Sequence, residues 1–372
     1  MIKYLGSKRL LVPRVLSLVR QLPEVRTVLD LFSGTARVGH ALKRDGYYVV
    51  ANDHLTYAAT LARCYVAADA RKVGQDARRL VLELARLKGS PGYFTHTFCE
   101  RSRFFHPKNG ARIDVIRDRI ERLGLDEIRK AVLLVSLMEA ADRVDSTTGV
   151  QMAYLKTWAP RALNDLELRV PEVLPGPGEA HQREAEEAAA LLAADVAYLD
   201  PPYNQHRYLG NYHVWETLVR WDAPEVYGTA CKRVDCRQYS SAFNSRPRIA
   251  AAMRQVLQGL RCRYVIASFN NEGYLPREEM AALLGEVGEV QVVEVDFKRY
   301  VGAQIGIFNP RGEKVGRVSH LRNKEYLFVA GLQGAALPEG LARAGERPEC
   351  GGATKPPLPR RARSRADSAA MG

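Results

Sequence analysis

The sequence lacks the features that mark several common protein classes. Its six cysteines contain no Cys-x-x-Cys pair, and the two nearest in sequence, Cys231 and Cys236, have no pair of histidines close by, so we expect no metal site. No stretch approaches the ~18 consecutive apolar residues of a membrane span. The basic N-terminus also lacks the apolar run of a signal peptide. We therefore expect a soluble cytoplasmic protein with reduced thiols.

A full Gly-x-Gly-x-x-Gly fingerprint is also missing, although the sequence does have a strand, a glycine-containing turn and a helix in that order. An apolar strand predicted at 27–32 leads into Ser33-Gly34-Thr35-Ala36 and a helix, which is typical of the nucleotide-binding opening of a doubly wound α/β fold. A second strand at 47–53 ends in Asp53, an acid that can accept both ribose hydroxyls. Without a pyrophosphate fingerprint the pattern favours an adenosine ligand such as S-adenosyl-L-methionine. A purely structural βαβ unit is the alternative.

Acidic residues are too few to balance the basic ones. The 372 residues, 46% of them apolar, include 55 Lys and Arg against 42 Asp and Glu, a formal net charge of +13. This length fits one large or two medium domains. The charge excess, part of it in the stretch after residue 350, favours a polyanionic partner such as nucleic acid. The alternative is that the basic surface serves solubility alone.

Between about residues 55 and 177 the strand pattern stops and amphipathic helices dominate. Apolar residues recur at helical spacing over 113–123 and again over 128–138. Ahead of them, residues 101–110 interleave basic and aromatic side chains, which could track phosphates and stack on bases. We interpret the segment as an inserted, mostly helical domain. The alternative for 101–110 is that the rings belong to the core and the arginines are solvated.

The chain is organised around Asp200-Pro201-Pro202-Tyr203, where a short apolar strand stops with Asp200 as its expected last residue. Neither proline can donate to a sheet and each fixes φ, so the backbone leaves the strand in a rigid turn. Ligands bind at the carboxyl ends of strands in open α/β sheets. A carboxylate, the Pro201 carbonyl and an aromatic ring are therefore expected at a site, and the polar stretch 204–213 suggests a loop over a ligand. An ordinary strand-to-loop exit is the alternative.

The remaining pattern completes an α/β domain. We expect helices at 10–22, with Ser7 as N-cap, and at 184–194, 249–260 and 277–284, and strands at 263–268, 291–297 and 326–330. The connection 298–324 is either a hairpin arm onto a phosphate backbone or a flexible surface loop. From about Gln333 onward the composition of Gly, Pro, Ala and Arg predicts disorder.

Together these motifs resemble one family, the D12-class adenine-specific DNA N6-methyltransferases, relatives of the Dam methylase. The resemblance extends over about residues 1–331. It rests on Lys3-Tyr4-Leu5-Gly6-Ser7-Lys8, Asp30-Leu31-Phe32-Ser33-Gly34, Asn52-Asp53, Arg103-Phe104-Phe105 with Asn109, Ile113-Asp114 and Arg117, Thr147-Thr148-Gly149 with Ala153-Tyr154-Leu155-Lys156, Asp200-Pro201-Pro202-Tyr203 with Asn204, Ser268-Phe269-Asn270 and Lys298-Arg299-Tyr300. Three features depart from the family: Ala36 stands where a second glycine is usual, Glu184 is a weak match for an acid before the catalytic turn, and the basic tail has no counterpart.

The resemblance implies a Rossmann-like sheet of the S-adenosyl-L-methionine-dependent methyltransferases with an inserted, mostly helical DNA-recognition domain. The expected boundaries are 1–60 and 179–332 for the two parts of the catalytic domain, 61–178 for the insert and 333–372 for a disordered basic tail. The implied reaction is site-specific methylation of N6 of an adenine flipped out of double-stranded DNA, with S-adenosyl-L-methionine as donor and no metal. The enzyme would act near the nucleoid, in a restriction–modification system with a separately encoded restriction endonuclease or as an orphan methylase.

The resemblance also implies residue roles. Asp200 and the carbonyl of Pro201 would accept the N–H bonds of N6, Pro202 would keep the turn rigid, and Tyr203 would stack on the base. The expected cofactor-binding residues are Tyr4 and Lys8 at the methionine end, Asp53 at the ribose, and Asp30, Phe32, Ser33 and Gly34. The expected nucleic-acid-binding residues are Arg101, Arg103, Lys108, Asn204, Arg207 and Tyr208. An RNA N6-adenine methyltransferase and a non-catalytic nucleic-acid-binding subunit stay open as alternatives.

Overall fold

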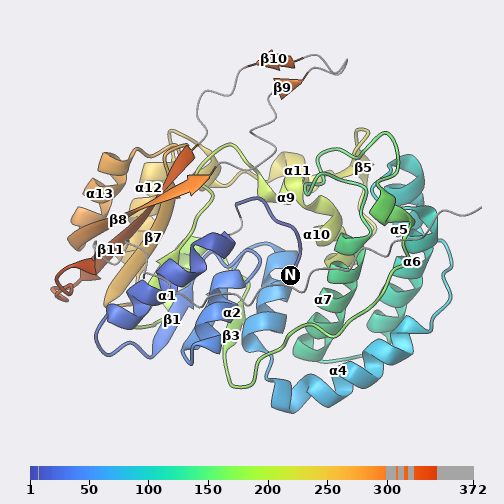
Figure 1. Ribbon diagram of the computed structural model, residues 1–372, viewed down its shortest axis with the longest axis horizontal. Helices are drawn as coiled ribbons and strands as arrows, with labels where there is room; N and C mark the ends of the chain where they lie inside the picture. The colour runs from blue at the N-terminus through green and yellow to red at the C-terminus, as the bar shows by residue number, and fades with distance from the viewer. Residues whose placement is uncertain (7, 299–306, 309–313, 317–321, 342–372) are drawn as a thin grey trace, which may run out of the picture.

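A seven-stranded sheet forms the centre of the protein. The computed structural model describes residues 1–6, 8–298, 307–308, 314–316 and 322–341 (Figure 1). The strands lie in the order β3-β2-β1-β4-β7-β11-β8. Their bounds are Thr27–Asp30 for β1, Tyr48–Asn52 for β2, Glu179–His181 for β3, Val196–Leu199 for β4, Tyr264–Asn270 for β7, Gly288–Lys298 for β8 and Arg322–Leu332 for β11.

The sheet is parallel except at one position. β3, β2, β1, β4 and β7 pair in parallel, whereas β11 runs antiparallel to both of its neighbours, β7 and β8. Parallel strands need crossover connections, which place helices on the faces of the sheet. The predicted Rossmann-like α/β class is confirmed.

Strand β4 is buried along its whole length, and β1 from Val28 onward, because both faces of the sheet are covered there. Along β1, Val28 faces one apolar core and Leu29 the other, and along β4, Ala197 and Tyr198 alternate in the same way. This is the burial expected of a doubly covered parallel sheet, where neither face meets water. The carboxyl ends of β1, β2 and β4 therefore offer the positions at which polar side chains can appear.

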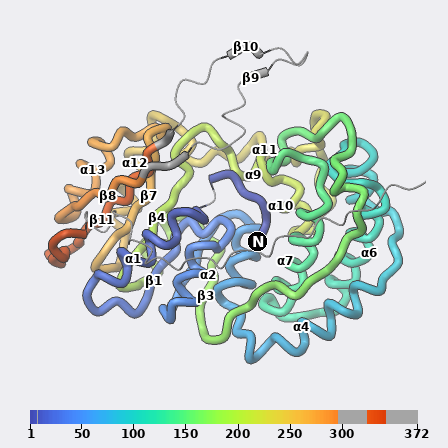
Figure 2. The backbone as a smooth tube through the Cα atoms, in the orientation of Figure 1, coloured from blue at the N-terminus to red at the C-terminus, as the bar shows by residue number. Residues whose placement is uncertain are grey.

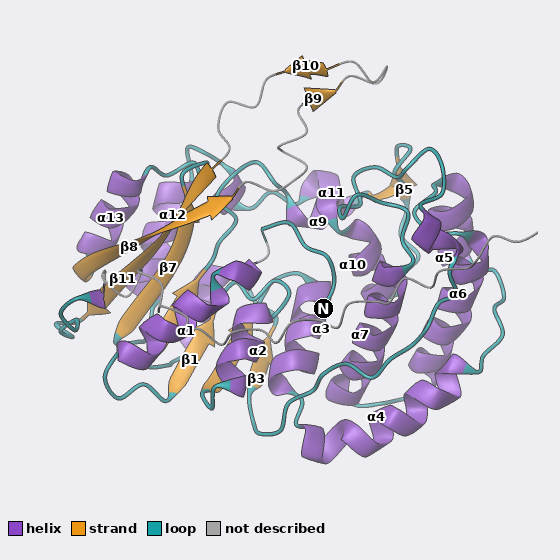
Figure 3. Cartoon of the chain, viewed as in Figure 1, coloured by secondary structure: helices purple, strands orange, loops and turns teal. Residues whose placement is uncertain are grey.

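Helices cover the two faces in separate layers (Figures 1 and 3). The core on one face includes α1, α2 and α3, and the core on the other includes α8, α12 and α13. Their bounds are Val12–Gln21 for α1, Arg37–Arg44 for α2, Thr56–Ala62 for α3, Ala185–Leu191 for α8, Ile249–Gly259 for α12 and Arg277–Gly285 for α13.

A helical region lies beside the sheet and shares the first of these cores. It contains α4 (Ala70–Ala85), α5 (Tyr93–Thr95), α6 (Pro107–Arg122) and α7 (Glu127–Arg143), with π-helical turns at Arg63–Ala67 and His96–Arg101 and a 3-10 turn at Pro160–Leu163. Asp69 and Asp126 begin α4 and α7 by accepting hydrogen bonds from backbone N–H groups of the first turn. Division of the chain into domains at 60, 178 and 332 stays a prediction.

Several element bounds differ from the expectations. A 3-10 turn at Lys8–Leu10 precedes α1, which begins at Val12, and Ser7, the expected N-cap, lies outside the described residues. β4 ends at Leu199, so Asp200 follows the strand instead of closing it. The stretch expected as a loop over a ligand contains α9 (Tyr208–Asn211) and the start of α10 (His213–Arg220). Strands β8 and β11 are each longer than predicted.

The segment 101–110 also differs from a phosphate-tracking loop with stacking aromatics. Phe104 and Phe105 are fully buried in the core, and α6 starts at Pro107. The structure therefore confirms the alternative that these rings belong to the core. Aromatic neighbours from α10 and α5 pack against them, with Trp215 and Phe94 at ring-centroid distances of 6.0 and 5.4 Å from Phe105.

Two predicted stretches are described only in part (Figure 2). Within the connection 298–324, β9 (Ile307–Phe308) and β10 (Lys314–Gly316) pair antiparallel, whereas 299–306, 309–313 and 317–321 lie outside the described residues. In the tail predicted from 333, Leu337 and Leu341 are buried, so the packed part extends at least to Leu341. Residues 342–372 lie outside the described residues.

Four short elements follow α10: β5 (Val226–Tyr227), β6 (Lys232–Arg233), α11 (Asp235–Gln238) and a 3-10 turn at Ala242–Asn244. β5 and β6 form a separate antiparallel pair. Within the described part of the chain, no helix combines the length and the apolar character needed to cross a membrane.

Candidate active site

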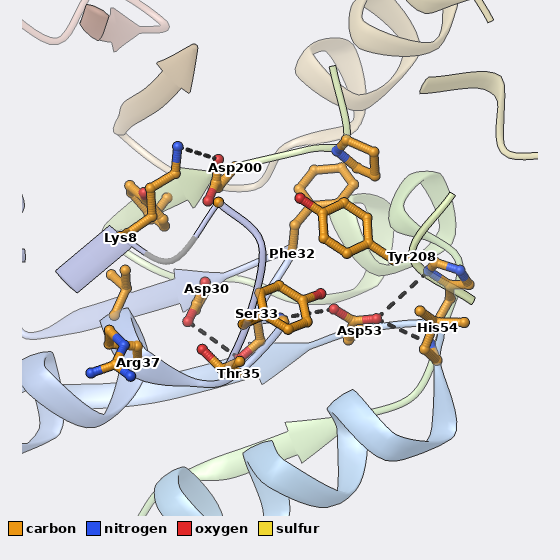
Figure 4. Close-up of a pocket in the computed structure, with 17 residues that line it drawn as sticks. Lys8, Asp30, Phe32, Ser33, Thr35, Arg37, Asp53, His54, Asp200 and Tyr208 are labelled. Carbon is orange, nitrogen blue, oxygen red and sulfur yellow. Dashed lines mark hydrogen bonds and ion pairs between the residues drawn. The ribbon is translucent and has the colours of Figure 1, made fainter. Parts of the chain in front are cut away.

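A cavity opens where β1, β2 and β4 end. Figure 4 shows Lys8 and Asp200 at one end of it, Asp53 and His54 at the other, and Asp30 with Ser33 between them. All seven residues expected to bind a cofactor line this cavity: Tyr4, Lys8, Asp30, Phe32, Ser33, Gly34 and Asp53. Asp200, Pro202 and Tyr208 line it too, so the structure brings the N-terminal motif, the first two strands and the Asp-Pro-Pro-Tyr turn together.

The turn after β1 depends on left-handed backbone at two positions. Gly34 has φ +53° and Ala36 has φ +58°. Glycine adopts this region without strain, whereas an L-residue such as alanine is strained by about 1–2 kcal/mol. Ala36 is completely buried, and its small side chain fits among the core residues. Ala36 stands where the family usually has a second glycine, and glycine would adopt this left-handed backbone without strain.

Asp53 fixes this turn against the end of β2. One carboxylate oxygen accepts the backbone N–H of Gly34 at 2.9 Å, and the other accepts the backbone N–H of Leu55 at 3.0 Å. Each oxygen of a carboxylate can accept a further hydrogen bond. Asp53 therefore keeps acceptor capacity toward the cavity it lines.

Asp30 is the most deeply buried acid of the cavity, with 1% of its surface exposed. Its Oδ2 accepts the backbone N–H of Gly39 at 3.0 Å and the hydroxyl of Ser33 at 3.3 Å. Burial raises the pKa of Asp30 to about 7, the Gly39 N–H opposes this rise, and the charge of Asp200 adds to it. A cation bound in the cavity would favour the ionised form of this group.

Asp200 lies directly after β4 beside a buried ammonium group. Lys8 Nζ is 3.1 Å from Asp200 Oδ1 and donates a hydrogen bond to Glu325 Oε2 at 3.4 Å. Burial raises the pKa of Asp200 to about 6; Lys8 opposes the rise and Glu325 adds to it. Burial by itself would lower the pKa of Lys8, but its neighbours, Asp200 foremost, raise it well above its ordinary value. Asp200 is therefore ionised at neutral pH.

Tyr203 is held in place through its hydroxyl and its backbone. Asn270 Nδ2 donates to the hydroxyl at 3.1 Å, and the Tyr203 carbonyl accepts the backbone N–H of Tyr274 at 2.7 Å. The ring centroid lies 5.5 Å from that of Phe269, and Lys8 Nζ lies 5.4 Å from it. Among the described residues, no hydrogen bond ends on the carbonyl oxygen of Pro201.

The expected nucleic-acid-binding residues lie in three different settings. Arg101 and Arg207 are exposed, and Asn204 caps its own loop by accepting the backbone N–H of His206. Lys108 donates to the Leu163 carbonyl at 2.6 Å and pairs with Asp165, and Arg103 lies over the ring of Trp158 at 4.5 Å. Tyr208 lies in the cavity, with its ring stacked on Tyr4 at 5.2 Å.

Sequence patterns missed several residues of the site. Glu325, His54, Tyr239 and Phe243 had no predicted role. His54 and Tyr239 stack at 4.9 Å, and Phe32 meets Phe243 edge-on at 5.1 Å beside Asp53. The signal available for Glu325 was an acid immediately before the apolar run that starts at Tyr326.

Comparison with known proteins assigns the chain to a family. The family model of the D12 class N6 adenine-specific DNA methyltransferases matches residues 4–281. The chain belongs to this family. Within the described part of the chain, no cluster of three or more His, Cys, Asp or Glu side chains could hold a metal ion.

The relatives of this D12-class chain include type II modification methylases. The modification methylase StsI of Streptococcus sanguinis is 28% identical over 80% of the chain and 48% of its own length. The type II methyltransferase M.FokI of Planomicrobium okeanokoites is 29% identical over 80% of the chain and 49% of its own length. The chain thus spans about half the length of these two relatives. The type II methyltransferase M.NlaIII of Neisseria lactamica is 27% identical, with 80% of the chain and 90% of its own length covered.

Proposed function

We propose that this D12-class chain is a site-specific DNA adenine N6-methyltransferase that uses S-adenosyl-L-methionine and serves in a restriction–modification system. The observation that carries the proposal is the shared cavity: Asp200 lies in it together with all seven residues expected to bind the cofactor. The family description and the names of the relatives support DNA as the polymer and adenine N6 as the acceptor.

The residues of the cavity fit S-adenosyl-L-methionine by their chemistry. Asp30 offers a carboxylate to the ammonium group of the methionine end, near Tyr4 and Lys8, and Asp53 offers one to the ribose. The stacked pair of His54 and Tyr239 would hold the adenine ring of this donor, and the buried Nε2 of His54 has no hydrogen-bond partner among the described residues. When bound, this donor supplies a methyl group on a positively charged sulfur, an electrophile for an amine lone pair.

Asp200 and the Pro201 carbonyl activate the target amine. The N6 lone pair of adenine is delocalised into the ring, so N6 is a weak nucleophile. Acceptors that draw on its two N–H bonds localise the lone pair on nitrogen, and fixed acceptors do so without reorganising during the reaction. Asp200 supplies one ionised acceptor, the carbonyl of Pro201 supplies the other, and Asp200 afterwards takes up the N6 proton.

Tyr203 receives the target base. An adenine in duplex DNA has to leave the stack before its N6 can reach Asp200, and enzymes that act on bases hold the flipped base against aromatic rings. The hydrogen bond from Asn270 and the contact with Phe269 fix the Tyr203 ring next to Lys8. Exposed basic residues such as Arg101 and Arg207 are then available to phosphates of the bound strand.

The test is expression in a host without DNA methylation, followed by sequencing that detects N6-methyladenine. We expect a recurrent methylated sequence motif in the host DNA. In the purified protein, Asp200→Ala should reduce methyl transfer by about a hundred- to a thousandfold while calorimetry still records binding of S-adenosyl-L-methionine. Asp76→Asn, on an ion-paired acid of α4 outside the cavity, is the matched control and should retain activity. Methylation of RNA alone, or robust turnover by the Asp200 variant, would refute the proposal.

A further inference from the structure

One ammonium group in the site is shared by two carboxylates. Lys8 Nζ lies 3.1 Å from Asp200 Oδ1 and 3.4 Å from Glu325 Oε2. All three side chains are largely buried, with exposed fractions of 7% for Lys8, 18% for Asp200 and 12% for Glu325. With both acids ionised, the cluster carries one net negative charge, in a setting where charges interact more strongly than in water.

Glu325 reaches this cluster from the strand that runs antiparallel to its neighbours. In the register of β7 and β11 it lies opposite Asn270, the residue whose amide holds the Tyr203 hydroxyl. Two facing residues therefore support the two groups proposed to contact the target base. Asn270 holds the ring of Tyr203, and Glu325 holds Lys8, which lies beside Asp200.

The second carboxylate changes what Lys8 does to Asp200. Paired with Lys8 alone, Asp200 would have its charge largely compensated and would be a weaker acceptor of the N6–H bond. A second acid beside the same ammonium group shares its positive charge, so Lys8 compensates less of the charge of Asp200. The negative charge of the second acid also disfavours the ionised form of Asp200 and makes Asp200 more basic. A buried lysine with both acids also stays in one place, because leaving either carboxylate unpaired is costly.

We propose that Glu325 is a positioning residue for methyl transfer, which holds Lys8 between two carboxylates and thereby keeps Asp200 a strong hydrogen-bond acceptor toward adenine N6. This inference rests on the proposed function. Glu325 does not line the cavity, so we assign it no contact with the methyl donor.

The titratable groups that face Asp200 come from several elements. They are Lys8, Asp30 on β1, Tyr198 on β4, Tyr203, Tyr208 on α9 and Glu325 on β11. Burial raises the pKa of each of the three phenols, so they remain neutral through the range in which Asp200 titrates. Replacing Glu325 by glutamine keeps the size of the side chain and removes one negative charge from this set.

The experiment compares Glu325→Gln with the wild type in single-turnover methylation of duplex DNA at saturating S-adenosyl-L-methionine across pH. We expect the plateau rate to fall about tenfold and the acidic limb to move to lower pH by about one unit, while the Kd for S-adenosyl-L-methionine stays unchanged by calorimetry. Glu325→Asp should restore part of both effects. Glu294→Gln is the matched control, because Glu294 on β8 pairs with Lys324 at the surface.

A second readout needs neither donor nor DNA. The carboxyl carbon of Asp200, followed by ¹³C NMR in the protein alone, should titrate at lower pH in Glu325→Gln than in the wild type. A rate loss with an unmoved acidic limb would mean that Glu325 is merely structural, and a raised Kd for S-adenosyl-L-methionine would mean that it binds the donor; either overturns the inference. If the wild type methylates no DNA, the proposed function fails, whereas the NMR titration still decides whether Glu325 acts on Asp200.

Discussion

Replacing Asp30 by asparagine should remove a large part of the pH dependence of this protein's stability. The pKa of Asp30 is raised from an ordinary 3.8 to about 7 in the folded protein, chiefly by burial. Because the folded-state value is the higher one, the protonated group stabilises the fold fully below its unfolded pKa. That contribution is lost as the pH rises through about 7. A shift of this size is worth about 4 kcal/mol in total, of which about 3 kcal/mol disappears between about pH 5 and pH 8.

The assay is urea unfolding followed by the fluorescence of Trp158, Trp215 and Trp221, at a series of pH values between about 5 and 8. Asparagine can still accept the Gly39 N–H and has no proton to lose. We expect the free energy of unfolding of the wild type to fall relative to that of the variant by about 3 kcal/mol over this range. Asp142, whose pKa is raised to about 6, contributes to both proteins and cancels in the difference.

A control with bound ligand uses S-adenosylhomocysteine, the product left when the donor has lost its methyl group. Its ammonium group would favour the ionised form of Asp30. Saturation with it should flatten the wild-type curve and leave the variant curve unchanged in slope. If the stabilities of wild type and variant run parallel over the whole pH range, Asp30 does not bind a proton in the folded protein. The account of its burial would then be wrong.

Four further outcomes follow from particular contacts. Asp114→Ala should lower the free energy of unfolding in urea by about 3–5 kcal/mol, because its carboxylate accepts three backbone N–H groups ahead of α6. Gly178→Ala should lower it by about 2 kcal/mol or more, since an added Cβ would meet a facing carbonyl oxygen at 2.5 Å. Ala36→Gly should raise the free energy of unfolding by about 0.5–1 kcal/mol, because glycine relieves the strain of the left-handed backbone at this position. Asn270→Ala should slow methyl transfer about tenfold with an unchanged Kd for S-adenosyl-L-methionine, because it frees the ring of Tyr203; an unchanged rate would contradict the role given to Tyr203.

The cavity at the carboxyl ends of β1 and β2 was predictable because its signals are local. The strand, the turn with Gly34, and the acid that ends the second strand lie within residues 27–53, and parallel strands bring their carboxyl ends to one edge. The Asp-Pro-Pro-Tyr turn is local in the same sense, since its prolines fix the point at which the chain leaves the sheet. Of the residues drawn from these patterns, Asp30, Phe32, Ser33, Gly34, Asp53, Asp200 and Pro202 line one cavity.

What the sequence could not supply depends on contacts between distant segments. Glu325 lies 317 positions after Lys8, and no periodicity links the two. Tyr208 looked like part of a DNA-facing loop, but the short helix α9 turns its ring onto Tyr4. Phe104 and Phe105 looked like base-stacking rings between arginines, and only the packing of α6 and α10 against them makes them core residues.

The position of β11 also bears on how the protein is made. This strand is the last of the sheet along the chain, yet it lies between β7 and β8 and supplies the hydrogen-bond partners of both. During synthesis, two strand edges must therefore wait unpaired until residues 322–332 have left the ribosome, and unpaired edges invite association with other chains. The same late strand carries Glu325, so a nascent chain that has already assembled its donor cavity still lacks the second acid on Lys8. Translation itself would thus leave Lys8 without its second carboxylate until residues 322–332 have joined β7 to β8.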